Sequence, residues 1–346
     1  MRNSTTYKLS GTKTFRLSSS KILGKWGGNL QNVEKALREI YIPDEGKKFV
    51  QVDQSGAEAL ITAYLCRNGN YRQLFLNNVK PHTYLAMQIF RDVWPKKMLE
   101  HRLITHDSGF NIDELIAAPI NQLKHNPFWK PLSNLIKSSD DWPLTERYYY
   151  LGKQAEHSSN YDIQPPMFRM NVLEKSGGKI VISKEDSERF LATKHALFPE
   201  IKQDFHAGVR KQVEATKCLY NLHGHPYQIT TYDIQETGWK ELYAWVPQST
   251  VGEITNNAYC AMQEFIEENG LQWDLLANTH DSYMLQCPID EEFICAKKAV
   301  EFMCQELTSP FDGTKFAMKA EAASGFTWAP AKENKNQNGL REIKFE

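Results

Sequence analysis

The sequence predicts a mixed α+β fold in which a few short strands are combined with many helices. Residues 48–53 (KFVQVD) alternate apolar and polar side chains, as a half-buried strand does. A polar turn in 276–290 (LANTHDSYMLQCPID) is flanked by apolar runs that predict two further strands, 275–278 and 283–287. Gly224-His225-Pro226 predicts a turn between another strand pair. Apolar residues recur at helical spacing after Gly56 and in 71–77, 82–91, 144–160, 185–217, 250–269 and 291–307.

The composition is that of a globular protein with a large core. The chain has 346 residues, of which 41% are apolar, so one large or two modest domains are expected. The net charge of −1 argues against a uniformly basic surface but allows a local basic groove. Residues 1–50 contain ten Lys or Arg against four acids, the first of which is Glu34. The first 33 residues therefore also have the composition of an organellar transit peptide, which is one alternative for this segment.

Neither a metal-binding cysteine pattern nor a membrane span is predicted. The six cysteines show no zinc-site spacing and are expected to be buried free thiols in a reducing compartment. No apolar run approaches 18 residues, so we expect no transmembrane helix.

Two aspartates interrupt apolar segments at predicted strand ends. Asp53 ends one strand and Asp281 lies in the turn between two others, while Glu58 follows Asp53 after a short glycine-containing turn. Either aspartate alone is most simply a turn former or a helix cap. Two carboxylates brought together are unstable as bare anions but stable around shared divalent cations, and oxygen-only ligands suit magnesium. A pair of such metals is the usual device for phosphoryl or nucleotidyl transfer.

A second candidate face lies in LGKQAEHSSNYD. Lys153, His157 and Tyr161 follow one another at intervals of four, which places a cation, an imidazole and an aromatic ring on one face of a helix. Such a face can hold a triphosphate at one end and stack on a base at the other. The alternative is an ordinary solvated face with Tyr161 turned inward.

The order of these stretches resembles one family, the family A DNA polymerases, which are related to bacterial DNA polymerase I and common in phages. KKFVQVDQSGAEAL, LGKQAEHSSNYD and LANTHDSYMLQCP resemble its motifs A, B and C. TKTFRLSSS with NLQN, KPHTYLAMQIF and VPQSTVGEITN resemble three further segments, so the likeness runs from about Thr12 to Trp328 in the family's order. It implies a right-hand palm, an antiparallel sheet with helices, and mostly helical fingers.

The resemblance also implies a domain arrangement. Residues 1–64 would begin the palm, 65–240 would form the fingers with a proline-rich insertion at about 93–145, 241–330 would complete the palm, and 331–346 would be a loose polar tail.

The metal site and the sugar gate follow from motifs A and C. Asp53 and Asp281 would bind two Mg²⁺ ions, for which Mn²⁺ can substitute, and the backbone carbonyl of Gln54 would be a further ligand. Glu58 would be the steric gate that excludes a ribose 2′-hydroxyl.

The incoming dNTP and the primer–template would be contacted by the remaining segments. Lys153, His157 and His82 would contact the triphosphate, and Tyr161 would stack at the nascent base pair. The residues expected to contact DNA are Arg16, Gln31 and Gln248, which would read minor-groove acceptors, and His280, which would lie near the primer end.

Several positions depart from the family pattern. Ser282 stands where many relatives carry a second acid, Asp162 replaces a usual glycine, and Pro165-Pro166 replace a stretch that normally holds an aromatic residue. The chain begins almost at the Arg16 segment, so thumb and exonuclease domains are expected to be absent here. We therefore expect a split polymerase whose second polypeptide carries both domains, acting in the cytoplasm of a phage-infected bacterial cell, with an organelle as the alternative.

Two other functions fit parts of the pattern. One is a non-catalytic DNA-binding subunit on a polymerase fold, which the presence of Asp53, Glu58, Lys153 and Asp281 argues against. The other is a single-subunit RNA polymerase, which Glu58 disfavours because it would clash with a ribose.

Overall fold

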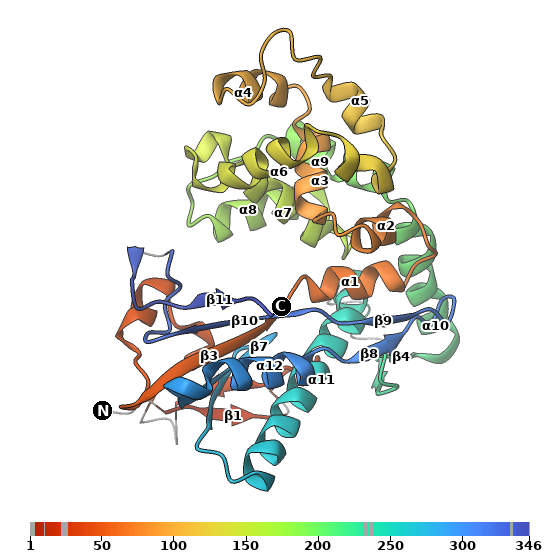
Figure 1. The fold of residues 1–346 in the computed structure, drawn as a ribbon. Helices are drawn as coiled ribbons and strands as arrows, with labels where there is room; N and C mark the ends of the chain where they lie inside the picture. The colour runs from red at the N-terminus through yellow and green to blue at the C-terminus, as the bar shows by residue number, and fades with distance from the viewer. Residues whose placement is uncertain are drawn as a thin grey trace. The chain divides into compact units, whose positions relative to one another are not determined.

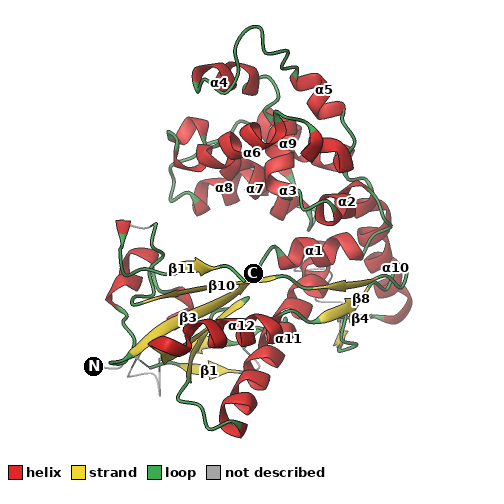
Figure 2. Ribbon diagram, in the orientation of Figure 1, coloured by secondary structure: helices red, strands yellow, loops and turns green. Residues whose placement is uncertain are grey.

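The protein, seen here as a computed structural model, is described for residues 4–9, 11–21, 27–230, 234, 238–332 and 335–345. It divides into two compact units, of which the first comprises 1–58, 220–226 and 245–346, and the second comprises 59–219 and 227–244. Strands dominate the centre of the first unit and helices make up most of the second (Figure 2).

The first unit is built on a five-stranded antiparallel sheet with strand order β11-β10-β3-β7-β6. β3 therefore lies at its centre, between β10 and β7 (Figure 1). The strands of this sheet are β3 (Lys47–Gln54), β6 (Asp274–Asn278), β7 (Ser282–Pro288), β10 (Ala320–Gly325) and β11 (Arg341–Ile343). The first three confirm the strands predicted at 48–53, 275–278 and 283–287 closely.

The two faces of the sheet are apolar along most of their length, as the period-two alternation of a strand requires. On one face Phe49 and Met284 pack with Trp328 in a buried cluster that also includes Leu30 and Ala277. On the other face α12 (Glu292–Met303) covers β3 and β10. There the hydroxyl of buried Tyr283 donates a hydrogen bond to the carbonyl of Ala299 at 3.2 Å.

A long helix and several short strand pairs complete this part of the fold. α11 (Gly238–Glu268) begins twelve positions before the predicted 250–269 helix, and the predicted 291–307 helix ends at Met303. The Gly224-containing turn does join two strands, as expected. The short elements are β1 (Thr6–Lys8), β2 (Ser18–Ser20), η1 (Leu30–Asn32), η2 (Lys35–Ile40), β4 (Cys218–Tyr220), β5 (Pro226–Gln228), η8 (Ile289–Glu291), β8 (Glu306–Thr308) and β9 (Lys315–Ala317).

The polar segment 331–346 is not a loose tail, which corrects the sequence-based expectation. Within its described residues, Arg341–Ile343 forms β11 and pairs with Ala322–Ser324 of β10. The amide of Ala331 also donates to the carbonyl of Leu340 at 2.9 Å. A polar composition is compatible with this position because an edge strand has one side open to water.

The second unit is a helical assembly whose core holds large aromatic side chains. Tyr71, Trp94, Phe168, Phe190 and Phe198 are all at most 2% exposed. Its helices are α1 (Ala57–Tyr64, which begins in the first unit), α2 (Asn70–Leu76), α3 (Pro81–Ile89), α4 (Trp94–Glu100), α5 (Ile112–Ala117), η3 (Ile120–His125), α6 (Trp129–Ser138), η4 (Ser139–Asp141), η5 (Leu144–Glu146), α7 (Tyr148–Ser159), α8 (Pro165–Lys175), α9 (Lys184–Leu197), η6 (Ile201–His206) and α10 (Ala207–Thr216).

The predicted long helix at 185–217 is divided in the structure. α9 begins at an N-cap, where the Ser183 hydroxyl accepts a hydrogen bond from the amide of Asp186 at 2.9 Å. It ends at Leu197, before Phe198-Pro199, because the residue preceding a proline is pushed out of the helical region. A π-helical turn, η6, then leads into α10.

The proline-rich 93–145 segment is a folded part of the second unit. Trp94 is fully buried, and its indole N–H donates to the carbonyls of Ala86 and Met87 on α3. Leu132 and Ile136 of α6 are also fully buried, and α6 packs against α3. The predicted short helices are present, and they are held by apolar burial.

α3 and α7 approach each other closely at Gly152. A Cβ placed there would lie 2.8 Å from Ala86 Cβ and 2.9 Å from the carbonyl oxygen of His82. The missing side chain is therefore what allows the two helices to touch.

Replacing this glycine is predicted to destabilise the chain. Gly152→Ala should cost about 1–3 kcal/mol, because the new methyl group overpacks a rigid contact. Gly208→Ala in α10 is the matched control, since nothing lies within 4 Å of its Cβ position, and it should stabilise by up to about 1 kcal/mol. Thermal denaturation of both variants gives their melting temperatures. Equal changes in melting temperature for the two variants would contradict the close approach of α3 and α7 at Gly152.

Candidate active site

Asp53 and Asp281 are brought together by strand pairing in the first unit. β3 and β7 pair so that Asp53 lies opposite Ser282, the residue after Asp281. The amide of Gln54 donates to the carbonyl of Asp281 at 3.0 Å. The Asp53 side chain is exposed and that of Asp281 is partly buried. Both aspartates therefore lie at the same end of two adjacent strands, as the sequence predicted.

The turn that carries Asp281 is tight. His280 has a φ of 69°, in the left-handed region, and the Asp281 amide donates to the Thr279 carbonyl at 3.0 Å. Ser282 Oγ lies 2.5 Å from the Thr279 hydroxyl, so its side chain belongs to the hydrogen bonds of the turn. Burial, reinforced by the charge of Arg16, lowers the pKa of His280 against the opposing effect of Asp281.

A third acid, Glu321, lies beside the pair and was missed by sequence reasoning. It is opposite Asp53 on β10, and its Oε1 accepts a hydrogen bond from Ser55 Oγ at 3.2 Å. The signal that could have found it is a single acid in a strand of small residues, KAEAASG. Its position follows from the sheet order, which the sequence did not predict.

The oxygen donors at this end of the sheet fit magnesium. Among the residues that the structure describes, no three or more His, Cys, Asp or Glu side chains form a metal site. Magnesium, however, usually takes only one or two carboxylates from the protein and fills its other positions with water and substrate phosphates. Asp53 and Asp281 meet that requirement.

Arg16 and Glu58 form an ion pair in the first unit. Arg16 Nη2 lies 2.5 Å from Glu58 Oε1, and the two side chains are 18% and 15% exposed. The Trp245 indole and the Asn256 amide donate to the carbonyls of Lys13 and Phe15, which holds the chain before Arg16 on α11. Both predicted site residues are thus fixed relative to each other.

Gln31 is buried and Gln248 is partly buried in the first unit. The Gln31 side chain donates to the carbonyls of Leu17 and Asn278 and accepts from the amide of Ser19, and the residue is 8% exposed. Gln248 is partly buried on α11. Their roles at the minor groove stay predictions.

In the second unit, α7 presents the cationic face expected from the sequence. Lys153 and His157 are exposed, whereas Tyr161 is only 5% exposed and packs edge-on to His157 at 5.6 Å between ring centroids. Tyr161 thus points inward, the alternative noted above, and its predicted stacking on a base stays untested. Asp162 has a φ of 58°, which explains why a glycine suits this position, and Pro165 opens α8.

Behind this face lies a buried polar network that the sequence did not reveal. Glu156 Oε1 accepts hydrogen bonds from the Tyr71 hydroxyl and from Asn160 Nδ2, and its Oε2 lies 3.3 Å from His82 Nδ1. Lys194 Nζ donates to Asn160 Oδ1. Apart from His82, these side chains are at most 1% exposed.

The charges of this network are set by its neighbours. Burial alone would raise the pKa of Glu156, but His82, Lys194 and the Tyr71 hydrogen bond lower it to about 2. Burial lowers the pKa of Lys194 to about 8, against the acids around it. At neutral pH the carboxylate is therefore ionised and the amine is mostly protonated.

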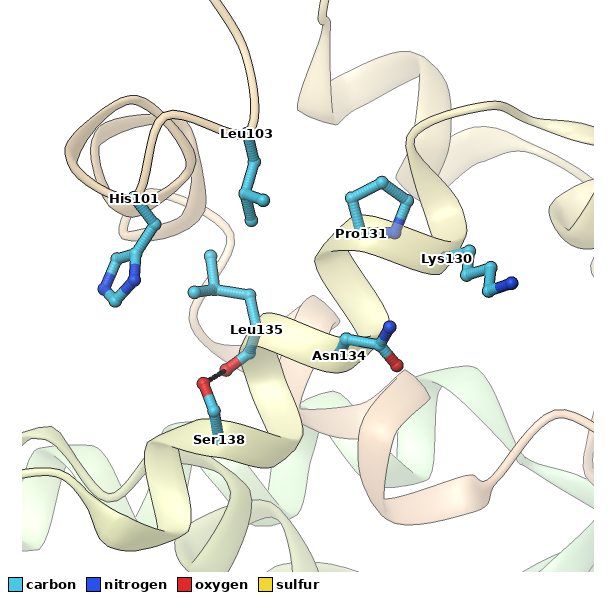
Figure 3. A pocket seen from close by; sticks show the side chains of 7 residues that line it. All are labelled: His101, Leu103, Lys130, Pro131, Asn134, Leu135 and Ser138. Atoms are coloured by element: carbon cyan, nitrogen blue, oxygen red, sulfur yellow. Dashed lines mark hydrogen bonds between the residues drawn. The ribbon is translucent and has the colours of Figure 1, made fainter.

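An open cavity of about 490 Å³ lies elsewhere in the second unit, between α4 and α6 (Figure 3). None of the predicted site residues lines it, and its walls are mainly apolar. The lining residues are His101, Leu103, Lys130, Pro131, Asn134, Leu135 and Ser138.

Comparison with proteins of known structure identifies this fold. No protein-family model matches the chain. The polymerase domain of Pol1 from M. smegmatis, solved with DNA primer-template and dNTP, matches with a TM-score of 0.63 and 16% identity, over 94% of this chain and 48% of that one. The fold is therefore that of a polymerase domain.

Two curated proteins agree with this assignment. The DNA polymerase I of Caldicellulosiruptor bescii is 20% identical over 338 residues, 95% of this chain and 32% of that protein. That of Bacillus caldotenax is 21% identical over 332 residues, 93% of this chain and 30% of that protein. The chain spans about a third of the length of these relatives. These similarities confirm the predicted polymerase-domain fold, while membership of family A and its phage type stay predictions.

The buried network predicts a specific pH dependence of stability. Glu156→Gln should lower the free energy of unfolding by roughly 3–5 kcal/mol at neutral pH, because it removes a buried negative charge that stabilises the buried Lys194 ammonium and His82. The folded-state pKa of Glu156, about 2, lies below its ordinary value of 4.5. Its contribution is therefore complete above pH 4.5 and is lost as the pH falls toward 2.

The difference in free energy of unfolding between the parent and Glu156→Gln should consequently narrow as the pH falls below 5. Denaturation at a series of pH values measures this difference. Glu188→Gln, which removes an exposed ion pair with Lys184, is the control and should change little. A difference that stays constant down to pH 3 would contradict the assigned charge of Glu156.

Proposed function

We propose that this chain carries the catalytic centre of a DNA-directed DNA polymerase, which joins a dNTP to a primer 3′-hydroxyl. The observation that supports it best is the β3–β7 register, which sets Asp53 beside the His280-Asp281 turn on a polymerase-domain fold. The M. smegmatis relative, solved with primer-template and dNTP, supports the same substrates. The expected second polypeptide stays a prediction.

The residues of the first unit would hold the reacting groups. Asp53 and Asp281 would hold Mg²⁺, which would supply Lewis acidity for attack by the primer 3′-hydroxyl and for departure of pyrophosphate. The strand pairing and the tight turn hold both carboxylates rigidly, so little reorganisation is needed during reaction.

Substrate selection would come from Glu58 and from the basic residues of the second unit. Glu58 excludes the ribose 2′-hydroxyl, and its ion pair with Arg16 keeps it in place. Exposed Lys153 and His157 would bind the triphosphate together with His82.

No helix among the described residues is long and apolar enough to cross a membrane.

Removing a metal-binding aspartate is predicted to abolish primer extension. Asp53→Asn and Asp281→Asn should each lower the rate by at least about a hundredfold, because each loses electrostatic stabilisation of the transition state. Chelation of divalent metal should have the same effect on the parent. Asp290→Asn, on the same unit but in an exposed turn, should keep near-parental activity. A parent as inactive as its Asp281 variant would favour the non-catalytic DNA-binding alternative.

The gate assignment predicts a change in sugar selectivity. Glu58→Ala should lower the preference for dNTP over rNTP by at least about tenfold, because the side chain that occupies the 2′ position is gone. Single-nucleotide incorporation with both substrates measures the ratio. Glu253→Ala is the control, since it removes another carboxylate ion pair of the first unit, that with His225. Efficient rNTP use by the parent would overturn the gate and favour the RNA polymerase alternative.

A further inference from the structure

His82 is the member of the buried network that reaches the surface. It is the second residue of α3, and its side chain is 22% exposed. The ring lies edge-on to Tyr149 at 6.1 Å between centroids. Nδ1 lies 3.3 Å from Glu156 Oε2, close enough for an ion pair but outside hydrogen-bond geometry in this structure. This orientation leaves Nε2, on the other side of the ring, as the nitrogen for a ligand.

The opposite oxygen of Glu156 is already satisfied. Oε1 accepts from Tyr71 and from Asn160, whose Nδ2 donates at 3.0 Å. Asn160 cannot exchange its amide oxygen and nitrogen, because its Oδ1 accepts from Lys194. The carboxylate is therefore held with Oε2 directed at His82.

The network places a charged acceptor, Glu156, behind the ring. Glu156 and Lys194 carry opposite charges, and the neighbouring His206 and His195 are neutral because burial lowers the pKa of the former to about 4 and of the latter to about 3. Buried charges are costly unless paired, so keeping this pair next to a partly exposed histidine needs an explanation. The absence of a side chain at Gly152 brings α7, which carries Glu156, close enough to α3 for the contact.

We propose that Glu156 is a positioning residue for nucleotide binding, which holds a proton on His82 Nδ1 and directs Nε2 outward to donate to the triphosphate. The inference rests on the proposed function, because it takes the polyphosphate of a dNTP as the ligand. A histidine that donates from both nitrogens is an imidazolium, and a carboxylate at one nitrogen stabilises that form when an anion binds at the other. Glu156 itself does not touch the nucleotide.

Steady-state incorporation kinetics test the role. We expect Glu156→Gln and His82→Ala each to raise KM for dNTP by about tenfold, with kcat changed by less than about twofold, and the double variant to match the single ones because they remove one interaction. Leu132→Ala is the control. It removes a fully buried apolar side chain of α6 in the same unit, so it should lower the melting temperature without raising KM.

Two results would overturn the proposal. One is an unchanged KM in Glu156→Gln while His82→Ala raises it. The other is a double variant whose KM increase is the product of the single increases, which would make the two residues independent.

A second measurement needs neither activity nor a folded Glu156 variant. Nitrogen-15 NMR of the histidine-labelled parent chain, with His82 assigned by its loss in His82→Ala, reports which ring nitrogen is protonated. We expect a protonated Nδ1, and a neutral ring protonated only at Nε2 would overturn the proposal. If the parent incorporates no dNTP, the proposed function fails, while the NMR result still decides whether Glu156 holds the His82 proton.

Discussion

The antiparallel pairing of β3 with β7 in a single register is the constraint on which the first unit depends. Because side chains alternate along a strand, a slip of one residue would exchange the two faces of β3. Phe49 would leave the cluster around Trp328, and Asp53 would leave its place opposite Ser282. The same alternation that fills the core thus places the carboxylate, so packing and chemistry cannot vary independently here. Apolar burial on both faces of the sheet is what makes the register unambiguous.

In the second unit, two charged side chains are buried inside a helical core. Glu156 and Lys194 lie where the packing of α3, α7 and α9 excludes water, and each is stabilised by polar groups contributed by neighbouring helices. Such an arrangement is tolerable only when it is complete, because a half-satisfied buried network costs more than an apolar one. The orientation of the partly exposed His82 therefore depends on the packing of the helical core around Glu156.

Local patterns in the sequence predicted much of this structure, and non-local contacts account for what they missed. The strands around Asp53 and Asp281 and the helices at 71–77 and 82–91 follow from side-chain periodicity, which each segment carries by itself. The helix predicted at 185–217 missed the break before Pro199, where α9 ends at Leu197. The proximity of Glu321 to Asp53 and of Glu156 to His82 was not predicted either, because it depends on which strand becomes a neighbour and on which helix face is buried. Likewise, nothing in the polar composition of 331–346 indicates that three of its residues extend the sheet.

The division of the first unit into separate chain segments has a consequence for how the protein is made. Its central strand, β3, is synthesised before the second unit, whereas both of its neighbours, β7 and β10, follow that unit. The second unit is encoded almost entirely between them and can acquire its local helical contacts first. On the ribosome, β3 therefore stays without its neighbouring strands until β7 and β10 have been synthesised. This interval, during which chaperones would be most useful, is the stage of biosynthesis at which the protein is most exposed to aggregation.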